Sequence, residues 1–226
     1  MTNQNLTENN WGNQLTTFAL AYGYFNRAFY TPPADEFIQT WVDERLFAEW
    51  PLAAENEQTK MGLQLLEAFS ANWGPAQLAE LKQDYARLFV GPDRLLAPPW
   101  ESVYLSTDHL VFEQQTVAVR HFYGRFNLQA PNLNTEPDDH IGLELAFMAH
   151  LCTLCLFAID ENDEAKLNEI LQAQRDFLSE HLLLWTPQFC GWVIERSKTE
   201  YFRGIGHLLS GCLQSAAEML GISQVR

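Results

Sequence analysis

Apolar residues recur every three or four positions along most of this chain, which is the spacing of one face of an α-helix. The first such run extends over residues 15–29 and stops before Pro32 and Pro33. Because proline fits the first turn of a helix, this pair predicts the start of a second helix, whose apolar face covers residues 37–46. The alternation that is typical of a strand is nearly absent, and only residues 102–112 are ambiguous.

The same spacing predicts further helical segments, which glycine and proline separate from one another. They cover residues 61–69, 78–89, 117–126, 137–159 and 164–184, and a final group from 187 to 220. Residues 91–99 hold too much proline for a helix and have no period, which predicts an ordered loop that serves as a hinge. We therefore predict an all-α fold, with residues 1–226 forming a single globular domain of about eight to ten helices.

The charge balance limits the classes of partner. Asp and Glu number 29 against 14 Lys and Arg, giving a net charge of −15, while 47% of the residues are hydrophobic. A chain this acidic repels nucleic acid and anionic membrane surfaces, and it attracts a basic partner. The first ten residues contain neither a basic residue nor an apolar stretch, so we expect no secretory signal or transit peptide. The most apolar stretch, residues 145–159, is shorter than the roughly 18–20 residues of a membrane span. We expect a cytoplasmic protein without an integral membrane segment.

Two groups of residues raise the question of a metal site. Cys152 and Cys155 share a helical face, but a structural zinc site needs four ligands and no second Cys-x-x-Cys exists. We therefore expect these cysteines to pack in the core, with no disulfide framework and no metal.

The acidic stretch around His140 allows two interpretations. Asp138, Asp139, His140 and Glu144 are close enough in sequence for a helical metal-dependent hydrolase. The same stretch is also typical of a helix start, with Thr135 as the cap and acidic side chains near the positive end of the helix dipole. The chain has no Gly-x-Ser-x-Gly, Walker or His-Glu-x-x-His motif, so the hydrolase alternative depends on this cluster alone.

A proline-stiffened segment presents large aromatic residues. Pro98 and Pro99 precede Trp100, and Tyr104 follows one helical turn later. Rigid aromatic side chains make good binding anchors because they lose little entropy on binding. The alternative, that Trp100 fills the core beneath its loop, is equally consistent with the sequence.

Three segments in this order resemble the TorD/DmsD family, cytoplasmic chaperones for molybdenum-containing reductases that are exported by the twin-arginine route. They are YARLFVGP at 85–92, PPWESVY at 98–104 and EPDDH at 136–140, and the resemblance spans most of the chain. The middle segment resembles the DmsD-like branch, whose clients are reductases of the dimethyl-sulfoxide type. The resemblance implies an all-helical fold, no catalysis, and no cofactor.

The resemblance also implies a function: binding of the client's twin-arginine signal peptide, or leader, and support of its maturation before export. Further implied partners are the twin-arginine translocase and the components of cofactor insertion. The implied leader site consists of Tyr85, Leu88, Phe89, Trp100, Tyr104, Glu136, Pro137, Asp139 and His140. The chain departs from the family in having tyrosine for tryptophan at 85 and 104, and in Glu101, which adds an acid near these aromatic residues.

The chemistry of a twin-arginine leader agrees with this site. Carboxylates at Glu136, Asp138 and Asp139 suit guanidinium groups, which form strong bidentate hydrogen bonds with them. Aromatic and aliphatic side chains suit the apolar segment that follows the arginines. If Asp139 and His140 contact the leader, replacing them by Asn and Ala should weaken binding and leave the fold intact. The sequence leaves open the client, the role of nucleotide, and the choice between a monomer and a domain-swapped dimer.

Overall fold

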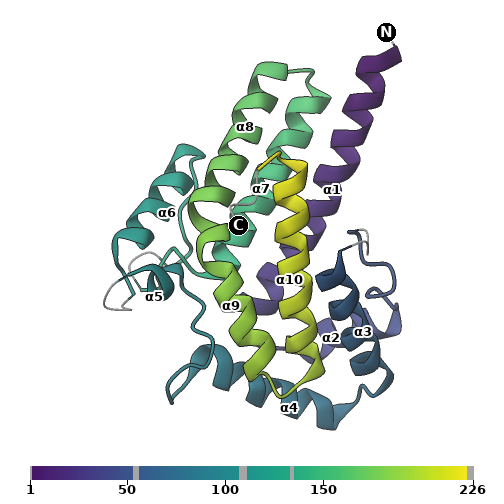
Figure 1. Cartoon of the computed structure of the whole chain (residues 1–226), viewed down its shortest axis with the longest axis vertical. Helices are drawn as coiled ribbons and strands as arrows, with labels where there is room; N and C mark the ends of the chain where they lie inside the picture. The colour runs from purple at the N-terminus through teal and green to yellow at the C-terminus, as the bar shows by residue number, and fades with distance from the viewer. Residues whose placement is uncertain (1, 53–55, 107–110, 133–134, 223–226) are drawn as a thin grey trace.

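The computed structural model describes residues 2–52, 56–106, 111–132 and 135–222, with the backbone alone for residues 2–10. Within these ranges the chain forms ten α-helices and two π-helical turns in one helical domain (Figure 1). The β structure of the same ranges is limited to an isolated bridge between Trp100 and His140. The prediction of an all-α fold is confirmed.

The helices lie in a bundle with smaller helices around it. Their bounds are α1 (Thr2–Tyr30), α2 (Asp35–Asp43), α3 (Glu57–Ala71), α4 (Pro75–Tyr85), α5 (Glu101–Leu105), α6 (Gln114–Arg125), α7 (Ile141–Asp160), α8 (Glu164–Phe177), α9 (Leu183–Arg196) and α10 (Glu200–Met219). The π-helical turns are η1 (Ala86–Val90) and η2 (Leu178–Leu182). Figure 1 shows α1, α7, α8, α9 and α10 running broadly along the long axis, with α5 and α6 on one side and α2 and α3 on the other.

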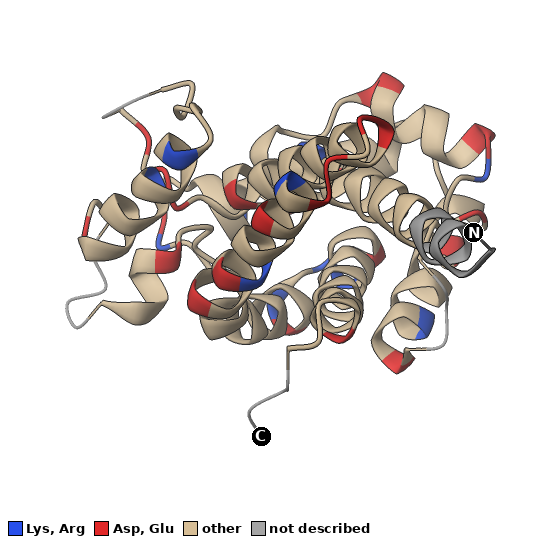
Figure 2. Cartoon of the chain, turned by 90° about the horizontal axis from the view of Figure 1, so that it is seen from above, with Lys and Arg blue, Asp and Glu red and all other residues tan. Residues whose placement is uncertain are grey.

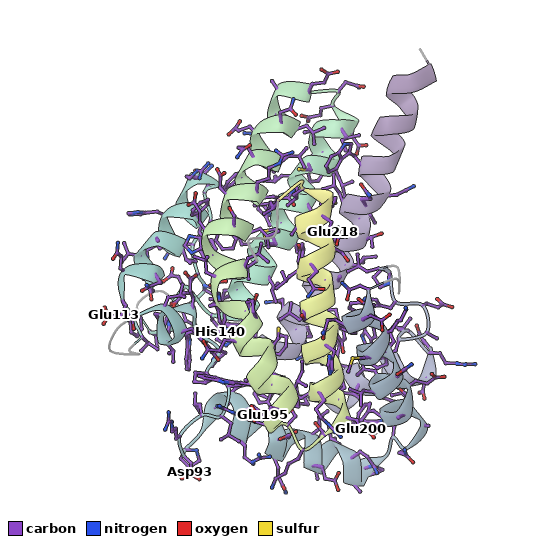
Figure 3. The ribbon with its side chains drawn as sticks, viewed as in Figure 1. Asp93, Glu113, His140, Glu195, Glu200 and Glu218 are labelled. Atoms are coloured by element: carbon purple, nitrogen blue, oxygen red, sulfur yellow. The ribbon has the colours of Figure 1, made fainter. Side chains whose placement is uncertain are left out.

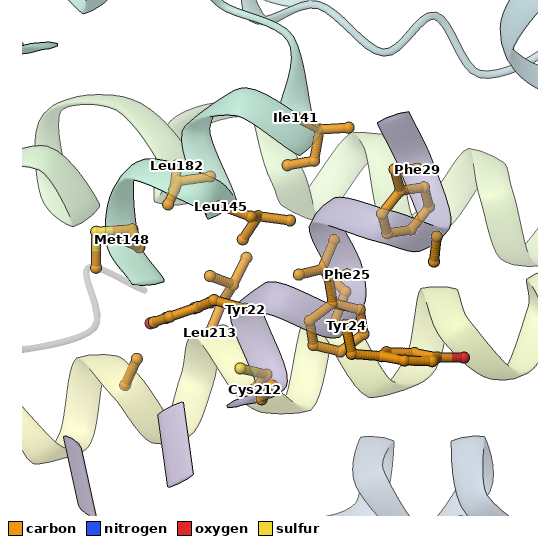
Figure 4. Packing of buried hydrophobic residues seen from close by; sticks show 14 of the residues in the cluster. Tyr22, Tyr24, Phe25, Phe29, Ile141, Leu145, Met148, Leu182, Cys212 and Leu213 are labelled. Atoms are coloured by element: carbon orange, nitrogen blue, oxygen red, sulfur yellow. The ribbon is translucent and has the colours of Figure 1, made fainter. Parts of the chain in front are cut away.

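The core lies where α1, α7 and α10 meet, as the close view in Figure 4 shows. Tyr22, Phe25, Leu145 and Met148 are almost fully buried there, together with Leu213 from α10. Burying a side chain of this size stabilises the fold by about 1.5–3 kcal/mol. This burial, added over the long helices, holds the bundle together.

The end of α1 lies beside the start of α7. The Asn26 Nδ2 group donates a hydrogen bond to the carbonyl oxygen of Gly142 over 2.8 Å. A Cβ atom at Gly142 would lie 2.7 Å from the Cβ atom of Tyr30, which is closer than two carbon atoms can pack. Glycine at 142 therefore allows α1 to approach α7, and this contact positions Tyr30 beside the residues before α7.

Pro187 does not begin a helix as the sequence suggested. The chain stays helical from Glu164 through η2 to Arg196, and Pro187 lies inside α9. A proline in a helix interior costs about 3 kcal/mol because one hydrogen bond is lost and the ring crowds the preceding turn. Trp185, Phe189 and Val193 lie on one face of α9 and are fully buried. The free energy gained by burying these three side chains exceeds the free-energy cost of the proline.

The other local predictions mostly agree with the structure. Cys152 and Cys155 are free and buried in the core, as expected. Residues 91–99 form a loop that is tied to η1, because the N–H groups of Leu96 and Ala97 donate to carbonyls of residues 87 and 88. In the ambiguous stretch 102–112, residues 102–105 belong to α5, and residues 107–110 lie outside the described part of the chain.

Helix α7 is the predicted apolar helix, but it is longer than the apolar stretch in the sequence. It has 20 residues, and its most apolar 18-residue window has a mean hydropathy of 1.9, so that length and composition alone would allow it to cross a membrane. In the fold it packs against α1 and α8, and 56% of its most apolar window is buried. A core helix of a globular protein has these same properties.

Candidate functional site

The structure places two of the sequence motifs side by side. The Glu101 N–H group donates to the Asp139 carbonyl oxygen over 3.0 Å, and the Ile141 N–H group donates to the Pro99 carbonyl oxygen over 2.8 Å. These two hydrogen bonds form the bridge between Trp100 and His140. The proline-stiffened segment and the acidic segment, about 40 residues apart in the chain, therefore form one local surface.

Asp138 and Asp139 hold this surface together from inside. Asp138 is fully buried and accepts hydrogen bonds from the guanidinium group of Arg120 on α6, the shortest over 2.7 Å. Asp139 is fully buried as well, and it accepts from the Ser102 N–H group over 2.8 Å and from the Thr116 hydroxyl over 2.6 Å. Neither carboxylate is exposed to receive an arginine from a partner, which corrects the expectation drawn from the sequence.

His140, and not Thr135, caps helix α7. The helix begins at Ile141, and the His140 Nδ1 atom accepts a hydrogen bond from the Gly142 N–H group over 3.0 Å. The helix therefore begins four residues later than the pattern predicted. Burial lowers the pKa of His140 to about 3, so the ring is neutral near pH 7 and its Nδ1 atom stays free to accept.

Two aromatic side chains meet at His140, which Figure 3 shows between α5 and α9. The ring of Tyr30 is edge-on to His140 with centroids 5.2 Å apart, and the ring of Trp100 is edge-on to it at 5.9 Å. Tyr30 and Trp100 are both partly exposed. The Trp100 Nε1–H group has no hydrogen-bond partner among the described residues.

Glu136 adds an accessible acid to these rings. Its Oε2 atom accepts from the Tyr30 hydroxyl over 2.7 Å and from the Asn132 amide over 3.4 Å, and the residue is partly exposed. Burial, and then the hydrogen bond with Glu136, raises the pKa of Tyr30 to about 12. We call the four residues Tyr30, Trp100, Glu136 and His140 the His140 corner.

The remaining predicted site residues lie behind this corner. Leu88 and Phe89 belong to the core, and Tyr85 is 6% exposed, with its hydroxyl donating to the Phe29 carbonyl oxygen over 3.0 Å. Burial, and then the charge of Glu136, raises the pKa of Tyr85 to about 12, so its hydroxyl is near the corner. These three side chains support the surface and do not form an open groove, contrary to our expectation.

Tyr104 and Pro137 also face the interior. The Tyr104 ring lies between Trp185 and Trp192, with centroids 5.1 and 5.0 Å away and interplanar angles of 41° and 40°. Its hydroxyl donates to the Pro98 carbonyl oxygen. Pro137 is buried. Tyr104 therefore fixes the segment that carries Trp100.

Glu101 has a partner inside the protein. It is 1% exposed, and its Oε2 atom lies 2.9 Å from His181 Nδ1 of η2. Glu144 is buried nearby and accepts from the Trp185 Nε1–H group over 3.2 Å. Burial, then the charges of Glu101 and Asp139, raises the pKa of Glu144. Glu101 therefore does not present an acid to a partner, which corrects the role that the sequence suggested for it.

The acidic cluster does not have the geometry of a metal site. Across the described ranges, no group of three or more His, Cys, Asp or Glu side chains is arranged to hold a metal ion. Asp138 and Asp139 instead make the hydrogen bonds given above, and His140 caps a helix. The arrangement suits the binding of a ligand to an aromatic and acidic surface.

Sequence reasoning missed Tyr30, because its position at the end of a long apolar run is typical of a core residue. Its role depends on the contact of α1 with α7. Glycine at 142 allows that contact, but the sequence alone does not show which helix approaches this glycine.

Comparison with known proteins agrees with this arrangement. Residues 53–191, more than half of the chain, match the family model described as nitrate reductase delta subunit. The chain belongs to this family, the TorD/DmsD family. The chain is 27% identical to the Tat proofreading chaperone DmsD of Salmonella typhi over 183 residues, which are 80% of this chain and 78% of that protein.

Relatives of the TorD kind match a shorter part of the chain at higher identity. The chaperone protein TorD of Aliivibrio fischeri is 32% identical over 147 residues, which are 64% of this chain and 66% of that protein. TorD of Vibrio cholerae El Tor is 36% identical over 140 residues, 61% of each chain. Both kinds are therefore similar to this chain, and membership of the DmsD-like branch stays a prediction.

Members of the family are chaperones and not enzymes. This confirms the prediction of a non-catalytic protein and places the chain among the chaperones of redox-enzyme maturation. The hydrolase alternative is not supported, because the family is not enzymatic and the cluster on which it depends is engaged in structural hydrogen bonds.

Proposed function

We propose that this protein is a cytoplasmic chaperone that binds the twin-arginine leader of a molybdenum-containing reductase of the dimethyl-sulfoxide type. It holds the leader while the client matures, and so prevents premature export. The names of its relatives, Tat proofreading chaperones among them, support this function. For this chain, the proposed function is supported mainly by the His140 corner, where partly exposed aromatic rings adjoin an accessible carboxylate.

The corner suits the junction between the arginines and the apolar part of a leader. The Glu136 carboxylate has a second oxygen atom and a partly exposed surface, and it is already fixed by Tyr30. An arginine of the leader can therefore pair with a carboxylate that is already held in place and loses little further mobility on binding. Trp100 and Tyr30 offer rigid rings for the first apolar residues.

The charge of the whole protein favours the encounter with such a leader. Figure 2 shows Asp and Glu on most of the helices, with fewer Lys and Arg among them. A net charge of −15 attracts a basic peptide, mainly by raising the association rate, and the effect weakens as salt screens it.

The revised leader site thus divides the predicted residues into two groups. Trp100 and Glu136, joined by Tyr30, contact the leader. The others hold these residues in place: Tyr85, Leu88, Phe89, Tyr104, Pro137, Asp138, Asp139 and the buried His140.

Titration of a synthetic twin-arginine leader, followed by calorimetry, tests this function. Binding of micromolar strength or better is expected at low salt, and replacing both arginines of the leader by glutamine should abolish it. Glu136→Gln should weaken binding about tenfold, equivalent to about 1.4 kcal/mol, and reduce its salt dependence.

Glu195→Gln is the matched control, because it removes the same charge from an exposed position on α9 that Figure 3 shows away from His140. It should leave the affinity nearly unchanged. If leaders from several molybdenum-containing reductases fail to bind at tens of micromolar, the proposed function is wrong. A preference for leaders of another reductase class would contradict only the choice of client.

A further inference from the structure

A shallow groove runs along α7 next to the His140 corner. Its volume is about 220 Å³, and its walls come from α7 and from the segment after α6. The wall residues are Leu128, Gln129, Ala130, Pro131, Leu143, Ala146 and His150, and buried rings of Tyr123 and Phe147 form the floor. No Asp or Glu lines the groove, which is mostly apolar although the protein is strongly acidic.

The groove begins where the corner ends. Pro131 lies beside Asn132, whose amide donates to Glu136, and Leu143 lies one helical turn after His140. An arginine paired with Glu136 would therefore place the following residues of the same peptide at the mouth of the groove.

The same face of α7 continues beyond the groove. His150, Thr153 and Phe157 follow Ala146 at helical spacing, and Phe157 is 59% exposed. The distance along α7 from residue 143 to residue 157 is about 21 Å at 1.5 Å per residue. This length equals that of a helix of about 14 residues. Among the residues whose side chains the structure describes, Phe157 at the far end of this face is not packed against the core.

We infer that the α7 groove receives the apolar helix of the leader, with the arginines of the leader at Glu136. This inference rests on the proposed function and adds the place and direction of the apolar segment. An α-helix is about 10 Å wide, so the groove admits side chains from one face of the helix and leaves the rest outside. Helix-in-groove binding of this kind uses apolar side chains at helical spacing. The charge of Glu136 favours this occupant, because a partly exposed carboxylate beside the groove suits a segment that begins with basic residues.

The test uses two peptides with the full-length protein: a complete leader, and its arginine-containing half without the apolar segment. Ala146→Gln fills the groove without adding charge, and it should weaken binding of the complete leader about tenfold or more. The same variant should leave the affinity of the short peptide unchanged. Ala165→Gln, at an exposed position on α8, is the matched control and should affect neither peptide.

A second variant distinguishes a blocked groove from misfolding of Ala146→Gln. Leu128→Gln changes the opposite wall of the groove, outside any helix, and should reproduce the effect of Ala146→Gln. If the complete leader binds both variants within twofold of its affinity for the unaltered protein, the groove is not its site and the inference is overturned, while the proposed function stands. If neither peptide binds the unaltered protein, the proposed function fails and the inference with it.

Discussion

Removal of the Asp139 side chain tests whether this residue contacts the leader or supports the fold. The carboxylate is fully buried and accepts hydrogen bonds from the Ser102 N–H group and the Thr116 hydroxyl. Hydrogen bonds to a charged group contribute about 1.5–3 kcal/mol each, and Asp139→Ala leaves both donors buried without an acceptor. We therefore expect the free energy of unfolding to fall by about 3–6 kcal/mol, a large part of the stability of an ordinary domain.

Asp139→Asn should be much milder. Its amide oxygen can accept from Ser102 while its amide nitrogen donates to the Thr116 hydroxyl, which is able to accept instead. The loss is then limited to the charge, about 1 kcal/mol, and removal of the repulsion with Glu144 offsets part of it.

Urea denaturation followed by circular dichroism measures both variants. For a chain of this size, a loss of 3 kcal/mol shifts the midpoint by about 1 M. Leader affinity, measured under conditions where each variant is folded, should change little for Asp139→Asn. If Asp139→Ala unfolds at the same urea concentration as the unaltered protein while leader binding is lost, Asp139 contacts the leader and our account of its role is wrong.

Two further predictions concern the corner. Trp100→Phe should retain most of the leader affinity, and it should not destabilise the fold because it removes an unpaired buried N–H group. Trp100→Ala should weaken leader binding at least tenfold through faster dissociation. Equal losses of affinity from both variants would show that the indole N–H group, and not the ring area, is needed. The pKa of His140 is lowered to about 3 in the fold, so between pH 6.5 and 3 the unfolded chain binds more protons and stability falls as the pH falls, by about 1.4 kcal/mol per unit. His140→Asn keeps a capping side chain, and it should reduce the stability difference between pH 7 and pH 5 by about 2 kcal/mol in urea titrations; an unchanged difference would contradict the neutral state of His140.

The sequence was sufficient for the helices because helical periodicity is a local property. Each apolar run overlaps a helix, although the run over residues 37–46 extends past the end of α2 at Asp43. Helix α7 began later than expected because His140 provided the cap in place of Thr135. Pro187 was misleading, because a local rule assigns proline to helix starts, while the burial of Trp185 and Phe189 retains it in a helix interior. The same local reasoning placed the cysteines in the core correctly.

Local reasoning was less successful for the site. The motifs located the right region, but they did not distinguish a carboxylate that faces solvent from one that faces the interior. Asp138 and Asp139 resemble Glu136 in the sequence, and only their distant partners Arg120, Ser102 and Thr116 make them structural.

The sequence by itself determined the helical class, the acidic surface and the family, since these depend on spacing and composition that are visible in the chain. Only the tertiary structure decided which of the motif residues are accessible. Accessibility depends on the packing of segments that are far apart in the chain, such as α1 against the start of α7, which brings Tyr30 to Glu136 and His140. A one-dimensional pattern fixes which face of a helix is apolar, but it contains no information about which distant residue covers a given side chain.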